Sequence, residues 1–161
     1  MRVLSLLMVC AVVLCLMLGA NLLTSPALAS TIETTVNINP ETLNLKAGGK
    51  WITAYIELHD DFDVSDIDIS TVLLDNIIPA ESNSKYGFVK NPEIKDRDGN
   101  GIPELMVKFD KHAVTSHVID KLYHMMPIPK RGEEVELTIT GSLIDGTPFE
   151  GSDTVRAIYP A

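Results

Sequence analysis

The sequence has little cysteine, few aromatic residues and less positive than negative charge. Its two cysteines, Cys10 and Cys15, both precede residue 30, so the rest of the chain has no thiol for a disulfide, a nucleophile or a Cys-based zinc site. Aromatic residues make up 6% of the chain, with one tryptophan. The 13 Lys and Arg against 22 Asp and Glu give a formal charge of −9, which disfavours nucleic acid as a partner and favours divalent cations.

Signatures of catalysis are also missing. The chain contains no HExxH, no GxSxG and no GxxxxGK[ST] motif. His117 and His124 are seven residues apart, so on a helix they could share a face but would lie two turns from each other. At ~1.5 Å per residue this separation is about 10 Å, which is too far for both to hold one zinc ion. His112 does not share a face well with His117. The sequence therefore predicts a protein that is not an enzyme.

Residues 1–29 contain no acidic residue and one cation, Arg2, before an apolar run over residues 3–20. Ala27 and Ala29 place small side chains at the two positions that an export peptidase reads. This pattern predicts a signal peptide cleaved after Ala29 and a secreted or cell-surface location. An uncleaved membrane anchor is the alternative, because an apolar run of ~18 residues approaches the length that spans a bilayer. Loss of Arg2 would leave 12 basic and 22 acidic residues, a formal charge of −10.

The most specific motif is the stretch over residues 96–104, DRDGNGIPE. Oxygen-bearing side chains at alternate positions and a glycine at the sixth are what a calcium loop requires. The predicted ligands of a Ca²⁺ ion are Asp96, Asp98, Asn100, the backbone carbonyl of Ile102, and Glu104, which binds directly or through water.

The loop departs from an EF-hand at its twelfth position, which is Val107 where a bidentate glutamate is expected. A helix pair is therefore not implied, and the apolar alternation of residues 105–109 predicts a strand after the loop. The alternative is a polar turn that binds no metal, since Asp, Asn and Gly favour turns for reasons unrelated to ions.

The remaining pattern is that of an all-β protein. Short alternating segments over residues 34–40, 43–45, 51–58, 71–74, 105–109, 135–139 and 153–159 predict strands, and Asp145-Gly146 predicts a hairpin turn. Helical spacing over residues 110–121 predicts one short helical insert. We expect an antiparallel β-sandwich (Ig-like) of about seven to nine strands, formed by residues 30–161 as a single domain.

The mature chain resembles a family of secreted β-sandwich modules of archaeal and bacterial cell-surface proteins. The resemblance lies in residues 39–46, 51–58, 66–72, the calcium-type loop with residues 106–110, and residues 146–156. It implies an extracellular module with a calcium-type loop and offers no catalytic residues. Residues 81–95 and 121–131 depart from it.

These observations predict a non-catalytic structural or adhesion module that Ca²⁺ stabilises, with cell-surface proteins or polysaccharide as partners. The alternative is a carbohydrate- or peptide-binding module that uses an exposed aromatic face. The aromatic candidates for such a face are Trp51, Tyr55, Tyr86 and Tyr123. Alternation places Trp51 and Tyr55 on the same side of one strand, opposite Ile52 and Ile56.

Overall fold

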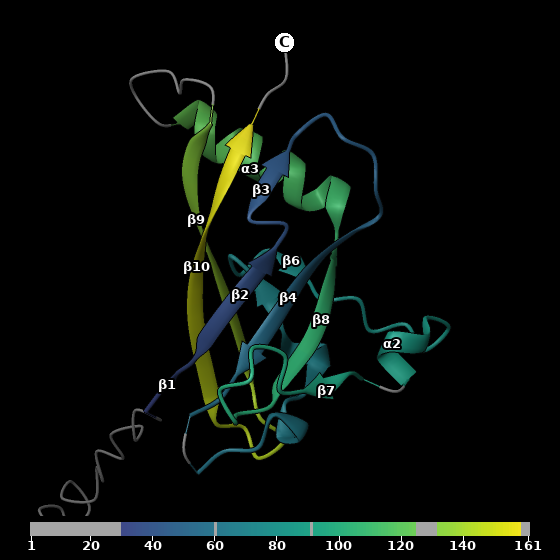
Figure 1. Cartoon of the computed structure of the whole chain (residues 1–161), viewed down its shortest axis with the longest axis vertical. Coiled ribbons are helices and arrows are strands. Elements are labelled where there is room, and N and C mark those ends of the chain that lie inside the picture. Colours follow the sequence, from purple (N-terminus) through teal and green to yellow (C-terminus); the bar gives the residue numbers. More distant parts are fainter. Residues whose placement is uncertain (1–29, 60, 91, 125–131, 159–161) are drawn as a thin grey trace, which may run out of the picture.

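Two β-sheets lie face to face and enclose one apolar core in the computed structural model, which describes residues 30–59, 61–90, 92–124 and 132–158 (Figure 1). The first sheet has the order β1 (Ile32–Glu33), β10 (Pro148–Ile158), β9 (Glu133–Ser142), β5 (Leu73–Leu74) and β6 (Ile78–Pro79), with β3 (Thr42–Asn44) also paired to β10. The second has the order β2 (Thr35–Asn39), β4 (Trp51–Glu57), β8 (Glu104–Asp110) and β7 (Ile94–Lys95).

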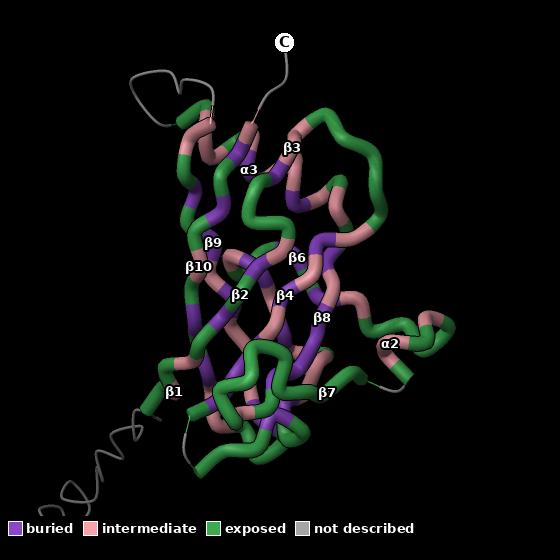
Figure 2. Tube along the Cα trace, viewed as in Figure 1, coloured by how far each residue is buried: buried purple, intermediate pink, exposed green. Residues whose placement is uncertain are grey.

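Alternation along the long strands determines which side chains enter the core. In β4, Ile52, Ala54 and Ile56 are buried, whereas the intervening residues from Trp51 to Tyr55 are half-buried. The same period of two appears in β9, as expected for strands with one face against a second sheet. Figure 2 shows the buried residues concentrated along the strands and the exposed residues mainly in the loops.

The N-terminal segment changes sheet at Thr34. Strand β1 runs parallel to β10 in the first sheet, whereas β2 pairs with β4 in the second. Gly151 of β10 lies at this crossing, and a Cβ there would be 2.4 Å from the carbonyl oxygen of Thr34. The missing side chain at Gly151 is what allows the two backbones to approach so closely.

Helix α3 (Lys111–His124) directly follows β8. The Oδ1 atom of Asp110 accepts a hydrogen bond from the Ala113 amide at 2.9 Å and so caps the first turn. Val114 and Val118, one turn apart, are fully buried and attach the helix to the core. The predicted helical insert is confirmed and continues to His124, whereas the prolines expected to end it lie outside the described residues.

A tight turn at Asp75 and Asn76 connects β5 to β6. Their φ angles are 49° and 57°, and the amide of Ile77 donates to the carbonyl of Leu74 at 3.1 Å. Asp and Asn tolerate this left-handed conformation better than other residues with a side chain, and consecutive left-handed residues match the twist of a hairpin.

Asp75 also joins helix α3 to the first sheet. Its Oδ2 atom accepts hydrogen bonds from Nε2 of His117 at 2.6 Å and Nζ of Lys121 at 2.8 Å, and its Oδ1 atom accepts the Thr138 amide at 2.8 Å. The carboxylate side chain is only 11% exposed. Burial opposes ionisation, but the three donors outweigh it and lower the pKa of Asp75 below its usual value.

Shorter helical segments occupy the connections. The acidic stretch after β4 contains two 3-10 turns, η1 (Val64–Asp66) and η2 (Ile69–Thr71), and α2 (Gly87–Lys90) precedes β7. Because η2 includes Thr71, the strand predicted over residues 71–74 is confined to its last two residues.

The predicted all-β class, the two-sheet sandwich and its largely antiparallel pairing are confirmed. The described residues form ten strands rather than the predicted seven to nine. Five of the ten are only two or three residues long, namely β1, β3, β5, β6 and β7. The first sheet is mixed, because β1 and β3 both run parallel to β10.

The predicted signal peptide at residues 1–29 lies outside the described residues. Across the described ranges, no helix has the length and apolar character needed to cross a bilayer.

Candidate metal centre

The loop over residues 96–104 is folded by its own side chains. Asp96 accepts hydrogen bonds from the amides of Gly99 at 2.7 Å and Gly101 at 3.0 Å. Gly101, at the sixth position, has a φ of 93°, the conformation for which the motif requires glycine. Asn100 accepts the amide of Ile102 at 2.7 Å. The motif therefore forms a wound polar loop rather than a two-residue hairpin turn.

Two glutamates meet at the strand ends beside this loop. Glu57 is the last residue of β4 and Glu104 the first of β8, and the two are directly opposite each other in the antiparallel ladder. They are 6% and 8% exposed. The Oε2 atom of Glu57 accepts Nδ2 of Asn100 at 2.8 Å, and the Oε2 atom of Glu104 accepts the Arg97 amide at 2.8 Å. Each glutamate is thus hydrogen-bonded to the loop.

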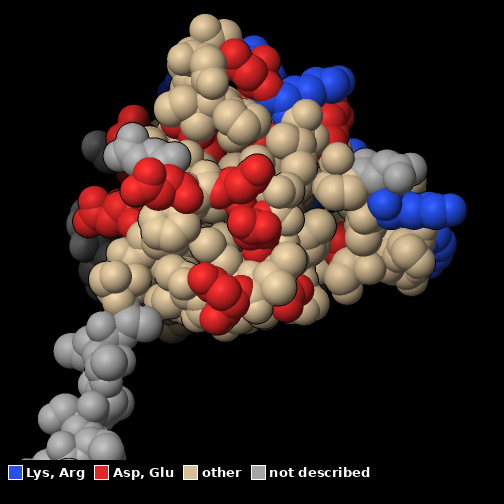
Figure 3. All heavy atoms as spheres, turned by 90° about the horizontal axis from the view of Figure 1, so that it is seen from below, with Lys and Arg blue, Asp and Glu red and all other residues tan. Residues whose placement is uncertain are grey.

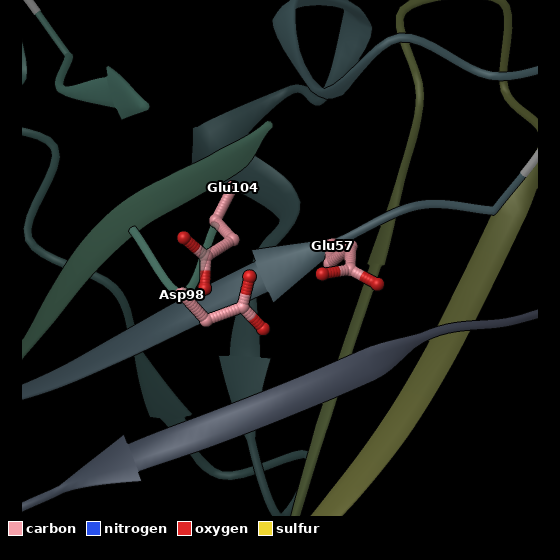
Figure 4. Close-up of side chains that lie close together, drawn as sticks. All are labelled: Glu57, Asp98 and Glu104. Carbon is pink, nitrogen blue, oxygen red and sulfur yellow. The ribbon is translucent and has the colours of Figure 1, made fainter. Parts of the chain in front are cut away.

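Asp98 completes a cluster of three carboxylates with Glu57 and Glu104. One oxygen from each lies within 4.8 Å of the other two (Figure 4). Ca²⁺ binds oxygens at ~2.3–2.6 Å, so two oxygens on opposite sides of one ion are up to ~5 Å apart. The carboxylate separations are therefore compatible with a shared ion.

Little positive charge from the protein balances this cluster. In the described part of the chain, the closest basic group to these carboxylates is His59, whose Nδ1 atom is 3.9 Å from Oε1 of Glu57. The Arg97 guanidinium instead stacks over the Tyr55 ring, 4.0 Å from its centroid. Two charges 4.8 Å apart repel by about 3 kcal/mol at an effective dielectric constant of ~20. A bound dication would remove this repulsion.

A cavity of about 370 Å³ leads to the cluster. Its lining includes Glu57, Asp98 and Glu104 together with Tyr55 and Arg97. Although two of the carboxylates are buried, their oxygens therefore border a space that an ion from solvent can enter.

The predicted ligands occupy different places in this arrangement. Asp98 and Glu104 belong to the carboxylate cluster, whereas Asp96 lies outside it and holds loop amides. Asn100 directs its amide nitrogen, not its oxygen, toward Glu57 and Asp98, so its amide would have to rotate to bind a cation. The backbone amide of Ile102 helps to close the loop. The five-residue ligand set stays a prediction.

Glu57 is the residue that the sequence did not indicate. It is 43 residues before Asn100 and belongs to no metal motif. The sequence indicates a role for Glu57 only indirectly. An acidic residue ends one amphipathic strand, and another acidic residue begins the strand with which it could pair. Only the register of β4 against β8 brings the two together.

The aromatic candidates do not form one continuous face. Trp51 packs against Tyr86 and Phe88, whereas Tyr55, on the same side of β4, is covered by Arg97. Tyr123 is 78% exposed on α3.

Comparison with known protein families, curated proteins and solved structures gives no match. The resemblance to secreted cell-surface modules therefore stays a prediction from the sequence.

Proposed function

We propose that this protein is a non-catalytic, exported structural or adhesion module whose fold is stabilised by one Ca²⁺ ion. The observation that carries the proposal is the convergence of the Glu57, Asp98 and Glu104 carboxylates, with two of them buried at facing ends of β4 and β8. Export rests on the character of residues 1–29, and the absence of catalytic motifs favours a structural role.

Ca²⁺ is preferred because the cluster supplies oxygen donors alone and combines a loop with two strand ends. Ca²⁺ accepts six to eight oxygens in irregular geometry, whereas Mg²⁺ requires near-ideal octahedral geometry and keeps several waters. Without a twelfth-position glutamate the affinity should be modest, about 10⁻⁵ to 10⁻³ M.

The ion would join three parts of the second sheet. Asp98 belongs to the loop, Glu57 to β4 and Glu104 to β8, so one ion would fix the loop against the strand pair. It would also turn the repulsion between facing glutamates into attraction, which favours the observed register.

Isothermal titration calorimetry of chelator-treated protein with Ca²⁺ tests the proposal. We expect one ion per chain for the wild type and no measurable binding for Glu57→Gln, which keeps the shape of the side chain and one acceptor oxygen for Asn100 but removes the charge. Asp120→Asn removes one exposed carboxylate on α3 and serves as the matched control. If the Glu57 variant binds Ca²⁺ as tightly as the control does, the proposed site is wrong.

A further inference from the structure

A second cluster lies on the side of the second sheet that carries α2. The rings of Tyr86 and Phe88 are stacked, with centroids 5.7 Å apart and planes inclined by 9°. The Trp51 ring meets both edge to face, at 5.1 Å from Tyr86 and 5.6 Å from Phe88. All three side chains are half-buried, so the rings support one another and still present part of their surface to solvent.

Three lysines surround these rings. The Nζ atom of Lys50 is 4.7 Å from the Trp51 centroid and 4.3 Å from that of Tyr86. Lys85 lies 4.8 Å from the Tyr86 centroid, and Lys108 lies 4.2 Å from that of Phe88. We call this the Lys–aromatic patch, which consists of Lys50, Trp51, Lys85, Tyr86, Phe88 and Lys108.

In the part of the chain that the structure describes, no carboxylate pairs directly with the lysines of the patch, although Lys108 is close enough to Glu93 to help lower the pKa of that carboxyl. Within the described ranges, Lys50, Lys85 and Lys108 form no ion pair, whereas Lys95 and Lys121 each contact a carboxylate. A cation–π contact leaves the full charge on the ammonium group. Lys50 also donates to the Tyr86 hydroxyl at 2.6 Å, and hydrogen bonds from Lys50 and Lys85 lower the pKa of that hydroxyl.

This local charge contrasts with the rest of the molecule. The chain has a formal charge of −9, and carboxylates are spread over the face shown in Figure 3. Lys and Arg side chains stand at the right edge of that view, the side on which α2 lies in Figure 1, and also at its top. An anionic partner would therefore be attracted to the patch and repelled from the acidic surface beside it.

We propose that the Lys–aromatic patch binds an anionic polysaccharide built of uronic acid units. Each such unit offers a carboxylate to a lysine and an apolar face of C–H groups to an aromatic ring, so it matches both components of the patch.

Insertion into an anionic membrane fits the patch less well. Trp51, Tyr86 and Phe88 are half-buried and pack edge to face and in a stack, so much of their apolar surface is covered by one another and less of it faces outward. A membrane-binding segment presents its apolar side chains outward instead.

The test is binding of the full-length protein to polygalacturonate, measured by biolayer interferometry at low salt, both with Ca²⁺ and with chelator. The double variant Lys50→Gln/Lys85→Gln removes two patch charges. Lys46→Gln/Arg156→Gln removes the same charge from two exposed residues outside the patch, one of them four residues before Lys50 on the same loop. Dextran serves as the neutral polymer and phosphatidylglycerol vesicles as the lipid alternative.

We expect polygalacturonate to bind in both buffers, roughly tenfold more weakly to the patch variant than to the control variant, and more weakly as salt increases. Dextran and the vesicles should not bind. Equal loss in both double variants would overturn the proposal, because only the net charge would then matter. Binding that needs Ca²⁺, or patch-dependent binding to vesicles without binding to polygalacturonate, would also overturn it.

Discussion

Glu57 and Glu104 face each other across the β4–β8 ladder, and both are less than one-tenth exposed. Like charges at directly opposed positions destabilise a sheet, and burial strengthens the effect. This juxtaposition, adjacent to a loop that supplies Asp98, is what makes a cation at this end of the sheet physically favourable.

Calcium should therefore raise the thermal stability of the domain. At free Ca²⁺ about 100 times the dissociation constant, mass action adds about 2.7 kcal/mol to the folded state, enough to raise Tm by several degrees. Asp98→Ala should abolish this increase without lowering Tm in chelator, because it also relieves repulsion. Differential scanning calorimetry in chelator and in millimolar Ca²⁺ measures both. Identical wild-type curves in the two buffers would show that the loop is an ordinary polar turn.

Asp75→Asn should destabilise the fold at neutral pH by ~1–3 kcal/mol, because it weakens hydrogen bonds with His117 and Lys121. Asn also tolerates the left-handed backbone at this position, so the turn itself should persist. Chemical denaturation at pH 7 measures the difference between the two proteins.

The pH dependence of this effect follows from the lowered pKa of Asp75. A lowered folded-state pKa stabilises the fold above the unfolded value of ~3.9, and the stabilisation disappears as pH falls through the folded value. The difference between wild type and Asp75→Asn should thus shrink as the pH falls below about 4. A difference that persists unchanged at pH 2 would contradict a role for the ionised carboxylate.

Gly151→Ala should cost ~1–3 kcal/mol, since the added methyl would overlap the Thr34 carbonyl and force the strands apart. Gly48→Ala is the matched control, because an added Cβ there meets no atom within 4 Å. Urea denaturation of both variants gives the comparison. Equal midpoints would mean that the close approach of Thr34 to β10 can relax without cost.

Export predicts a mature protein that begins at Ser30. Intact-mass analysis of protein from the culture medium should show cleavage after Ala29, because the small-residue pattern at residues 27–29 matches a peptidase site. A membrane fraction in which Met1 or the unprocessed segment is retained would instead establish an anchor.

Local patterns predicted the parts of the fold that local forces determine. Alternation in β4, the helix after Asp110 and the glycine at position 101 could each be read from a few neighbouring residues. These features depend on side-chain periodicity and backbone preference, both of which a short window contains.

Contacts between distant segments could not be read in this way. Glu57 joins the carboxylate cluster only through strand register. Asp75 meets His117 only because α3, 42 residues along the chain, lies beside the turn between β5 and β6. Alternation predicts that Trp51 shares a face with Tyr55, and it does. The packing of Tyr86 and Phe88 onto Trp51, however, depends on where α2 folds back.

The parallel pairing of β1 with β10 also determines how the domain would respond to tension. If residues 30 and 158 are pulled away from each other, β1 and β10 move in opposite directions along their common axis. Their hydrogen bonds are then strained together in shear, rather than opened one after another from a single end. Strand β3 has the same direction relative to β10. A module fixed at one end and pulled at the other would thus have its mechanical clamp where β1 and β10 meet.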